Sequence, residues 1–201
     1  MPKETFTNLS NVKQEAITLA IQKAFLDKPM TKITVSDIVK YASIPRGSFY
    51  QYFEDLEDVF KYLVDYSLRA FEQTVLSRVE DAAIPFFDYL ENALEKDYTF
   101  LESSPHQKIV HKFFSQSSSY TVDFNSYLKR REAFYHQIIN HLDLTELQSI
   151  DTEKITPLYT HINQVKMQYI QRIMKERITL EQAKEEYLWF ITIIRKGLKE
   201  F

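Results

Sequence analysis

The sequence predicts an all-α fold that begins with a small helix-turn-helix domain. The 201 residues include only two glycines, Gly47 and Gly197, and most tight hairpin turns between strands require glycine. Apolar residues recur at three- and four-residue steps along most of the chain, which is the spacing of one helix face. A hydrophobic content of 44% with 26% charged residues is typical of a globular chain that buries a core.

The first helix is expected over residues 10–27. Its apolar positions have helical spacing, and Ser10 is a suitable N-cap. The helix should end at Lys28, because the following residue is Pro29 and the residue before a proline disfavours the α region.

Two short helices are predicted next, over residues 33–42 and 45–53. Thr34 and Asp37 have the spacing of a capping box at the start of the former. Pro45 suits the first position of the latter, because the N–H that proline lacks has no helical partner there.

The remainder of the chain is also predicted to be helical, with polar breaks and no strand. The sequences Thr145-x-x-Gln148 and Thr179-x-x-Gln182 have the pattern of capping boxes, and residues 115–119 form a serine-rich loop. The expected helical segments are 56–79, 82–101, a short stretch ending near 114, 121–143, 155–175 and 180–200.

Two short helices joined by a tight turn indicate a helix-turn-helix, whose second helix enters the DNA major groove. Arg46 can pair with guanine and Gln51 with adenine, while hydroxyl groups can contact phosphates and Gly47 allows close backbone approach. Phe49 and Phe53 are expected to face the core. The predicted DNA-contacting residues are Thr34, Pro45, Arg46, Gly47, Ser48, Tyr50, Gln51 and Tyr52.

The stretch from Thr34 to Phe53 carries Asp-Ile-Val at residues 37–39 and Gly-Ser-Phe-Tyr-x-Tyr-Phe at residues 47–53. It resembles the DNA-binding signature of the tetracycline-repressor-like (TetR) family. The resemblance implies a helix-turn-helix domain over residues 1–55 and a helical effector-binding and dimerisation domain over residues 56–201. The family often has a phosphate-contacting lysine where this chain has Leu56, so that contact is not expected here.

The resemblance also implies a homodimer formed through the last two helices and an unidentified small-molecule effector. The apolar stripe of those helices is the expected dimer interface, and aromatic residues of the middle of the chain are the expected lining of an effector pocket. The interface residues are Ile155, Tyr159, Ile162, Tyr169, Ile173, Tyr187, Ile191, Ile194 and Leu198. The pocket residues are Tyr89, Phe100, Phe113, Phe114, Tyr127 and Phe134.

Charge is distributed unevenly along the chain. Residues 1–53 carry seven basic and four acidic side chains, a net charge of +3, whereas the whole chain has a formal net charge of −3. The positive end is the one that could meet phosphate. No run of 18 apolar residues occurs, so no membrane partner is expected, and the chain is expected to be cytoplasmic.

Several chemistries are not expected from this sequence. The chain has no cysteine, which excludes disulfides and thiolate-bound zinc. His106 and His111 are five residues apart, as are His136 and His141, whereas two ligands on one helix face need a spacing of three or four. Phosphate loops and nucleophile motifs are missing as well, so we expect neither a metal, nor a cofactor, nor an enzyme.

The sequence therefore predicts a sequence-specific, DNA-binding transcriptional regulator. The resemblance implies a repressor that binds a near-palindromic operator in double-stranded DNA as a dimer and that a ligand releases. An alternative on the same fold is a DNA-organising protein that has no effector. A helical-bundle enzyme is a third possibility, for which the motifs above offer no support.

Overall fold

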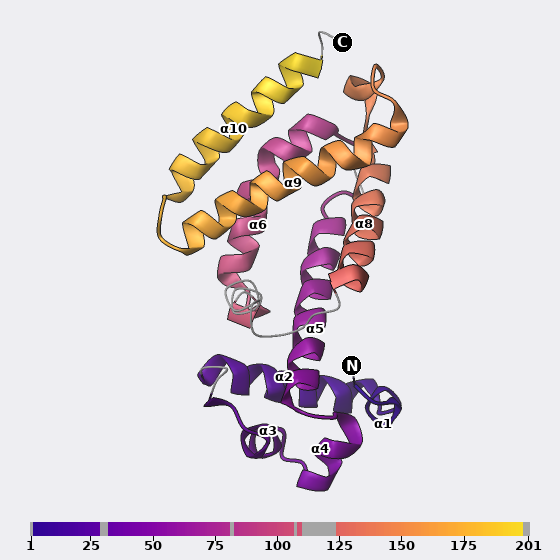
Figure 1. The fold of residues 1–201 in the computed structure, drawn as a ribbon, viewed down its shortest axis with the longest axis vertical. Coiled ribbons are helices and arrows are strands. Elements are labelled where there is room, and N and C mark those ends of the chain that lie inside the picture. The colour runs from indigo at the N-terminus through magenta and orange to yellow at the C-terminus, as the bar shows by residue number, and fades with distance from the viewer. Residues whose placement is uncertain (1, 29–31, 81–82, 107, 110–123, 199–201) are drawn as a thin grey trace. The chain divides into compact units, whose positions relative to one another are not determined.

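The computed structural model describes residues 2–28, 32–80, 83–106, 108–109 and 124–198, without the side chains of 124–129. These residues are helical almost throughout, as the sequence predicts (Figure 1). The chain divides into two compact units. The first comprises Met1–Ala70 and Ser104–Val122, and the second comprises Phe71–Ser103 and Asp123–Phe201.

The first unit contains α1 (Glu4–Thr7), α2 (Asn11–Asp27), α3 (Val35–Ala42), α4 (Arg46–Tyr52) and the first part of α5 (Leu56–Leu76). The three-helix arrangement predicted for residues 10–53 is confirmed, with helix bounds that differ by one or two residues.

Each of these helices gives a fully buried apolar side chain to one core. Ile21, Ile38, Phe49 and Leu63, from α2, α3, α4 and α5, are all 0% exposed. Because α3 and α4 are short, this shared core, rather than their intrinsic helix propensity, holds them in place.

The boundary between the two units differs from the predicted boundary after residue 55. It falls inside α5, between Ala70 and Phe71. Val59, Phe60 and Leu63 of α5 are buried in the first core, so the first turns of this helix belong to the N-terminal unit. Ile109, which follows α6 in the chain, is buried in the same core.

The second unit contains α6 (Phe86–Ser103), α8 (Phe124–Asn140), α9 (Thr152–Met174) and α10 (Leu180–Gly197). In Figure 1, α9 and α10 form an antiparallel hairpin, and α6 packs against both of them. The two long C-terminal helices are therefore confirmed. The capping box at Thr179 is confirmed too, since the Gln182 N–H donates to Thr179 Oγ1 at 3.2 Å.

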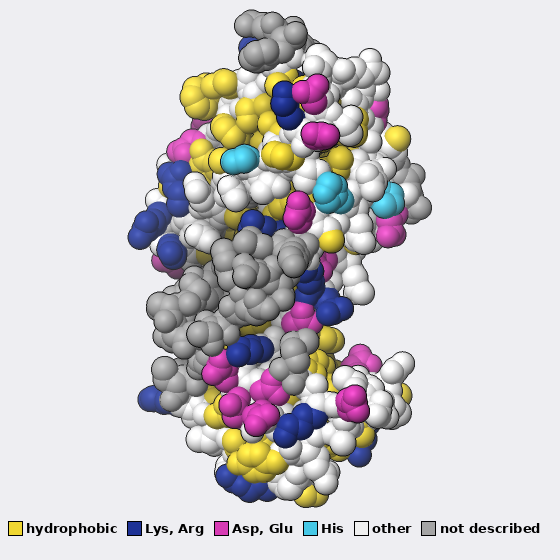
Figure 2. All heavy atoms as spheres, turned by 45° about the vertical axis from the view of Figure 1, so that its right-hand side comes forward, with side chains coloured by type: hydrophobic (Ala, Val, Ile, Leu, Met, Phe, Trp, Pro, Cys, Tyr) yellow, Lys and Arg dark blue, Asp and Glu magenta, His cyan; other side chains and the backbone are white. Residues whose placement is uncertain are grey.

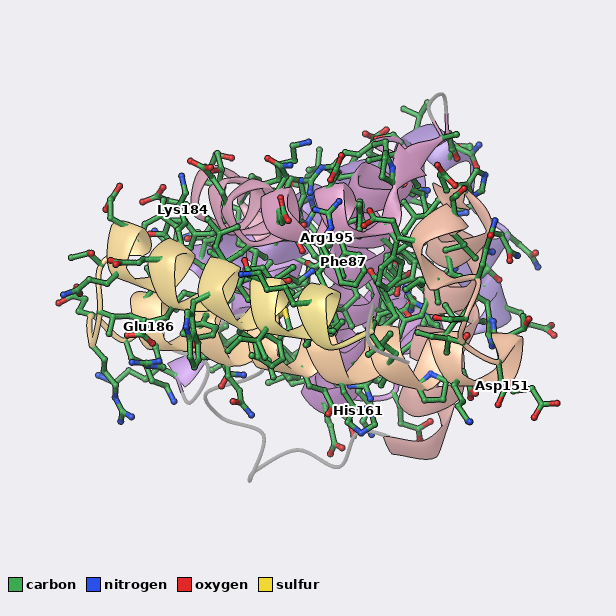
Figure 3. The ribbon with its side chains drawn as sticks, turned by 90° about the horizontal axis from the view of Figure 1, so that it is seen from above. Phe87, Asp151, His161, Lys184, Glu186 and Arg195 are labelled. Carbon is green, nitrogen blue, oxygen red and sulfur yellow. The ribbon has the colours of Figure 1, made fainter. Side chains whose placement is uncertain are left out.

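Charged side chains fix α10 against its neighbours. Figure 3 shows Arg195 and Lys184 on the α6 side of α10 and Glu186 on the opposite side. Arg195 lies over the ring of Phe87 at 5.4 Å and donates to Glu91 and to Glu146. Lys184 pairs with Glu95 at 2.7 Å, and Glu186 pairs with Arg172 of α9 at 3.0 Å.

Two local predictions for the second unit were wrong. Ile84–Pro85 (β1) pairs in parallel with Leu142–Asp143 (β2), although no strand was expected, because a two-residue segment shows no alternation. Thr145 does not cap an α-helix: it begins a single 3₁₀ turn, η2 (Thr145–Leu147), and its N–H donates to Asp143 Oδ1 at 2.9 Å.

A polar cluster lies inside the second unit. Asp97, 1% exposed, accepts hydrogen bonds from Lys166 Nζ at 2.5 Å and from Arg78 at 2.7 Å. Beside it, the hydroxyl groups of Tyr89 and Tyr159 are 3.3 Å apart, and burial raises the pKa of both. The buried carboxylate thus has two cationic donors, as buried charges require.

Within the described ranges, none of the helices combines the length and the apolar character that a membrane span requires.

Candidate nucleic-acid interface

The N-terminus of α3 is fixed by a reciprocal capping box. The Asp37 N–H donates to Thr34 Oγ1 at 3.2 Å, and the Thr34 hydroxyl and N–H donate to Asp37 Oδ2 at 2.9 and 3.0 Å. Lys28 Nζ lies 2.6 Å from the other carboxylate oxygen, and this ammonium, followed by Thr34, lowers the pKa of Asp37. The predicted cap is confirmed.

This geometry corrects the role predicted for Thr34. Its hydroxyl donates to a carboxylate and accepts from a backbone N–H, so its donor and one acceptor position are occupied. A phosphate placed at Thr34 would also approach the charged Asp37 carboxylate. Thr34 therefore caps α3 and is not proposed as a phosphate contact.

A left-handed residue makes the turn between the two short helices. Ser43 has φ 50° and ψ 41° at the C-cap of α3, and its N–H donates to Lys40 O at 3.3 Å. The Ile44 N–H then donates to Val39 O at 3.2 Å, which closes the end of α3. Pro45 is the N-cap of α4 rather than its first residue, so α4 begins at Arg46.

The seven residues of α4 divide into a buried face and an exposed face. Phe49, Tyr52 and, just after the helix, Phe53 are 0%, 7% and 0% exposed. Both phenylalanines face the core as predicted. Tyr52 was expected on the outer face, but it is 7% exposed and its ring packs edge-on against Phe6 at 5.8 Å, so the ring belongs to the core.

The other side chains of α4 are accessible from outside. Pro45, Arg46, Gly47, Tyr50 and Gln51 are exposed, and Ser48 is half-buried. An added Cβ on Gly47 would meet nothing within 4 Å, so the protein itself leaves open space at this position.

Two neighbours orient Arg46, the candidate base-reading residue. Its guanidinium donates to Ser36 Oγ of α3 at 3.0 Å and lies over the exposed ring of Tyr50, 5.9 Å from the ring centroid. These contacts reduce the number of conformations that the side chain must give up on binding. The spacing of α4 shows how Tyr50 meets Arg46, but Ser36 was missed because it comes from the preceding helix.

The charge of the described surface is mixed. On the face drawn in Figure 2, basic and acidic side chains are interspersed rather than gathered by sign. Glu54 and Asp55 follow α4 directly and are exposed, so acidic groups flank the candidate interface at one end.

Sequence reasoning also missed α1. Glu4–Thr7 is too short to show a helical period, yet Phe6 is 1% exposed and packs against Tyr52, Phe53 and Tyr62. Hydrogen bonds from this segment reach the last carbonyl groups of α4.

The predicted dimer residues lie mostly inside the protomer. Ile155, Tyr159, Ile162, Ile173, Tyr187 and Ile191 are between 0% and 8% exposed and belong to the core of the second unit. Tyr169, Ile194 and Leu198 are half-buried against that core. The apolar stripe of α9 and α10 is covered by the same chain, so the six buried residues cannot form a surface for a second chain.

Three of the predicted pocket residues, Tyr89, Phe100 and Phe134, are described, and none of them lines the hollow between α8 and α9. Tyr89 and Phe134 are buried in the second core, and Phe100 packs against Phe71 at 5.8 Å. Phe113, Phe114 and the side chain of Tyr127 lie outside the described residues. The hollow between α8 and α9 has a volume of about 600 Å³, and Tyr135, His136, Thr156 and His161 form part of its wall.

No group of three or more His, Asp or Glu side chains within the described ranges could hold a metal ion.

The N-terminal unit matches a known family. Residues 17–63 match the family described as "Bacterial regulatory proteins, tetR family". The matched segment includes α3, the turn at Ser43 and α4, which carry the exposed face described above.

Two curated relatives are transcriptional repressors. The chain is 24% identical over 117 residues to the HTH-type transcriptional repressor BepR of Brucella suis biovar 1 (strain 1330), covering 58% of this chain and 56% of the relative. It is 31% identical over 81 residues to the HTH-type transcriptional repressor DhaR of Mycobacterium sp. (strain GP1), covering 40% of each. The chain therefore aligns with about half of these relatives.

Solved structures share the fold over nearly the whole chain. SmeT, the repressor of the Stenotrophomonas maltophilia multidrug efflux pump SmeDEF, superposes with a TM-score of 0.63 at 13% identity, covering 94% of this chain and 91% of SmeT. A TetR family transcription regulator from Marinobacter aquaeolei VT8 gives 0.62 at 15% identity, covering 90% and 98%. Over residues 17–63 the chain is thus similar to the tetR family of bacterial regulatory proteins, and over most of its length it shares the fold of these solved regulators.

Proposed function

We propose that this chain is a transcriptional repressor that binds a near-palindromic operator as a dimer and leaves it when a small molecule binds. The observation that carries the DNA-binding part is the exposed face of α4, on which Arg46, Tyr50 and Gln51 are presented by a helix whose other face is buried. These side chains can reach base edges and phosphates in a major groove.

The geometry of Arg46 supports direct readout of guanine. Its guanidinium is already oriented by Ser36 and Tyr50, and arginine pairs in a bidentate manner with guanine O6 and N7. Gln51 lies five residues after Arg46 on α4 and is exposed, so its amide can pair with adenine.

Dimerisation is proposed through the outer face of α10. Leu188, Trp189 and Ile193 are 38%, 69% and 49% exposed on one side of this helix. A large apolar surface left open on one chain indicates an interface with another. This set replaces the core residues of α9 and α10 that the sequence suggested.

The effector site is proposed within the second unit. Support comes from the hollow between α8 and α9 and from the Tyr187 hydroxyl, which is buried with no hydrogen-bond partner among the described residues. A ligand with a polar group in the core could satisfy that hydroxyl. Screening small molecules for a rise in melting temperature and for loss of DNA binding tests this part.

Replacing Arg46 tests the DNA-binding proposal. An operator is first obtained by selecting bound fragments from random double-stranded DNA. Arg46→Ala should weaken binding to it by about 1–3 kcal/mol, because one bidentate base contact is lost. Fluorescence anisotropy against a scrambled duplex measures both affinity and selectivity.

Arg177→Ala is the matched control, since Arg177 is an exposed arginine of the second unit. Its affinity for the operator should equal that of the unmodified chain. If selection enriches no sequence at any salt concentration, or if Arg46→Ala binds the operator normally, the proposed role of α4 is refuted.

A further inference from the structure

The C-terminal end of α4 is completed by the N-terminal segment. The last carbonyl groups of a helix have no partner within the helix. Here three consecutive ones each accept a hydrogen bond from residues 3–5: Tyr50 O from Lys3 Nζ at 3.0 Å, Gln51 O from the Thr5 hydroxyl, and Tyr52 O from the Lys3 N–H at 2.8 Å.

The segment that makes these bonds is anchored in the core. Phe6 is 1% exposed, and its ring centroid lies 5.0 Å from that of Phe53 and 5.2 Å from that of Tyr62. The buried ring fixes α1, and α1 in turn places Lys3 beside α4. Lys3 is therefore held by two separate hydrogen bonds to α4 and by the packing of Phe6 in the core.

A cation at this end of α4 would favour the approach of DNA along the helix. A helix C-terminus carries partial negative charge, and Glu54 and Asp55 add two exposed carboxylates immediately after it. Both features repel phosphate. Lys3 is exposed, and its ammonium group uses one of three N–H donors on Tyr50 O, which leaves two that can face outward.

Tyr50 connects this cation to the proposed DNA-binding face. The carbonyl that holds the Lys3 ammonium belongs to a residue whose own side chain is 45% exposed on that face. Glu4 is the acidic neighbour of Lys3 in α1, and no ion pair between them occurs among the described residues. The ammonium is thus positioned at the end of α4, and no carboxylate among the described residues forms an ion pair with it.

We propose that Lys3 is a DNA phosphate contact, placed at the C-terminal end of α4 by its bond to the Tyr50 carbonyl. This inference rests on the proposed function and adds to it a residue from outside the helix-turn-helix. The contact recognises the backbone rather than a base, so it strengthens binding to any sequence.

Salt dependence separates this role from simple helix capping. Each phosphate contact that is lost lowers the steepness of log affinity against log salt by about 0.9. Lys3→Gln should therefore lower it by about that amount for each subunit bound. The affinity of Lys3→Gln for operator and for scrambled DNA should fall by the same factor. Lys3→Arg should have the affinity and the salt dependence of the unmodified chain.

Lys175→Gln is the matched control, because Lys175 is an exposed lysine of the second unit. It makes the same change in net charge and should leave the salt dependence as it is. Circular dichroism and denaturant unfolding of each variant establish that it is folded.

Two results would overturn the inference. One is an unchanged salt dependence in Lys3→Gln together with a selective loss of operator binding, which would make Lys3 a cap that positions α4. The other is a Lys3→Gln variant whose affinity for both duplexes and whose salt dependence equal those of the unmodified chain. Failure of the unmodified chain to bind any DNA would instead refute the proposed function, and this inference with it.

Discussion

Arg46 illustrates how a side chain of this protein is oriented by one neighbour from its own helix and one from the preceding helix. Its guanidinium is held by Ser36, ten positions earlier, and lies over Tyr50, four positions later. Thr34 shows the opposite outcome, since its hydroxyl group is consumed by a cap. Residue type alone suggested DNA contact for both, and the hydrogen-bond partners distinguish them.

Gly47 allows stability and DNA binding to be separated. Gly47→Ala should raise the free energy of unfolding by up to about 1 kcal/mol, because alanine favours a helix more than glycine and the added Cβ meets nothing within 4 Å. Binding to the operator should nevertheless weaken, since the methyl group would stand between α4 and the groove. Urea unfolding and anisotropy measure the two quantities, and a variant that binds the operator as well as the unmodified chain would contradict the close approach.

The buried hydroxyl of Tyr187 is expected to lower the free energy of unfolding of the second unit. Its hydroxyl is buried without a hydrogen-bond partner among the described residues, and burial raises the pKa of this phenol. Tyr187→Phe should raise the free energy of unfolding by about 1 kcal/mol, because a buried polar group without a partner is removed. Tyr159→Phe is the control, since it breaks the pair with Tyr89 and should destabilise the protein. A loss of stability in Tyr187→Phe would show that the hydroxyl is satisfied.

At the scale of the helix, α3 and α4 depend on their ends. Neither exceeds eight residues, so each has few internal hydrogen bonds to hold it. The ends are completed by the capping box at Thr34, the turn at Ser43 and the bonds from Lys3 and Thr5. A helix of this length remains ordered because its terminal groups and its buried face are both satisfied.

Substitutions at Ser43 are expected to change the stability of the turn between α3 and α4. Its φ of 50° is left-handed, which costs a non-glycine residue energy that glycine does not pay. Ser43→Gly should therefore raise the free energy of unfolding by a few tenths of a kcal/mol to about 1 kcal/mol. Ser43→Val should lower it, because a β-branched side chain is disfavoured there. Thermal unfolding of the two variants gives the sign of each change, and a glycine variant that melts below the unmodified chain would be inconsistent with strain at this turn.

At the scale of the whole molecule, the proposed dimer can be followed through Trp189, the one tryptophan of the sequence. Its side chain is 69% exposed on a single chain and would become buried in the dimer. Its fluorescence should shift to shorter wavelength as protein concentration rises. Sedimentation of Ile193→Asp should show a monomer, since a charge would be placed in the interface.

Val12→Asp provides the comparison for this experiment. Val12 is 79% exposed on α2 in the other unit, so the same kind of substitution there should leave the dimer intact. A dimeric Ile193→Asp, or a Trp189 emission that does not change with concentration, would place the interface elsewhere.

The long helices were predictable because a period of 3.6 residues repeats many times along them. The short α1 was not, since four residues hold barely one turn, and its position depends on Phe6 reaching a distant core. The prediction of the dimer residues failed because it rested on periodicity alone. Periodicity identified the apolar stripe of Tyr187 and Ile191, but a stripe does not reveal whether the same chain or another covers it.

The candidate interface was predicted in its main features and missed in its details. Arg46, Gly47, Tyr50 and Gln51 are accessible as expected, because alternation within α4 follows directly from the burial of Phe49. Tyr52 was misplaced because a tyrosine suits both a core and a surface, and only the ring of Phe6 decides between them.

The division of α4 into two faces has a consequence for how such a protein could acquire new targets. Phe49, Tyr52 and Phe53 hold the helix, whereas Arg46, Tyr50 and Gln51 take no part in the core. A library that varies only the latter three positions should therefore remain folded in most of its members. Variants with new operator preferences could be selected from such a library with little change in the free energy of unfolding. The same holds for substitutions that arise in a genome.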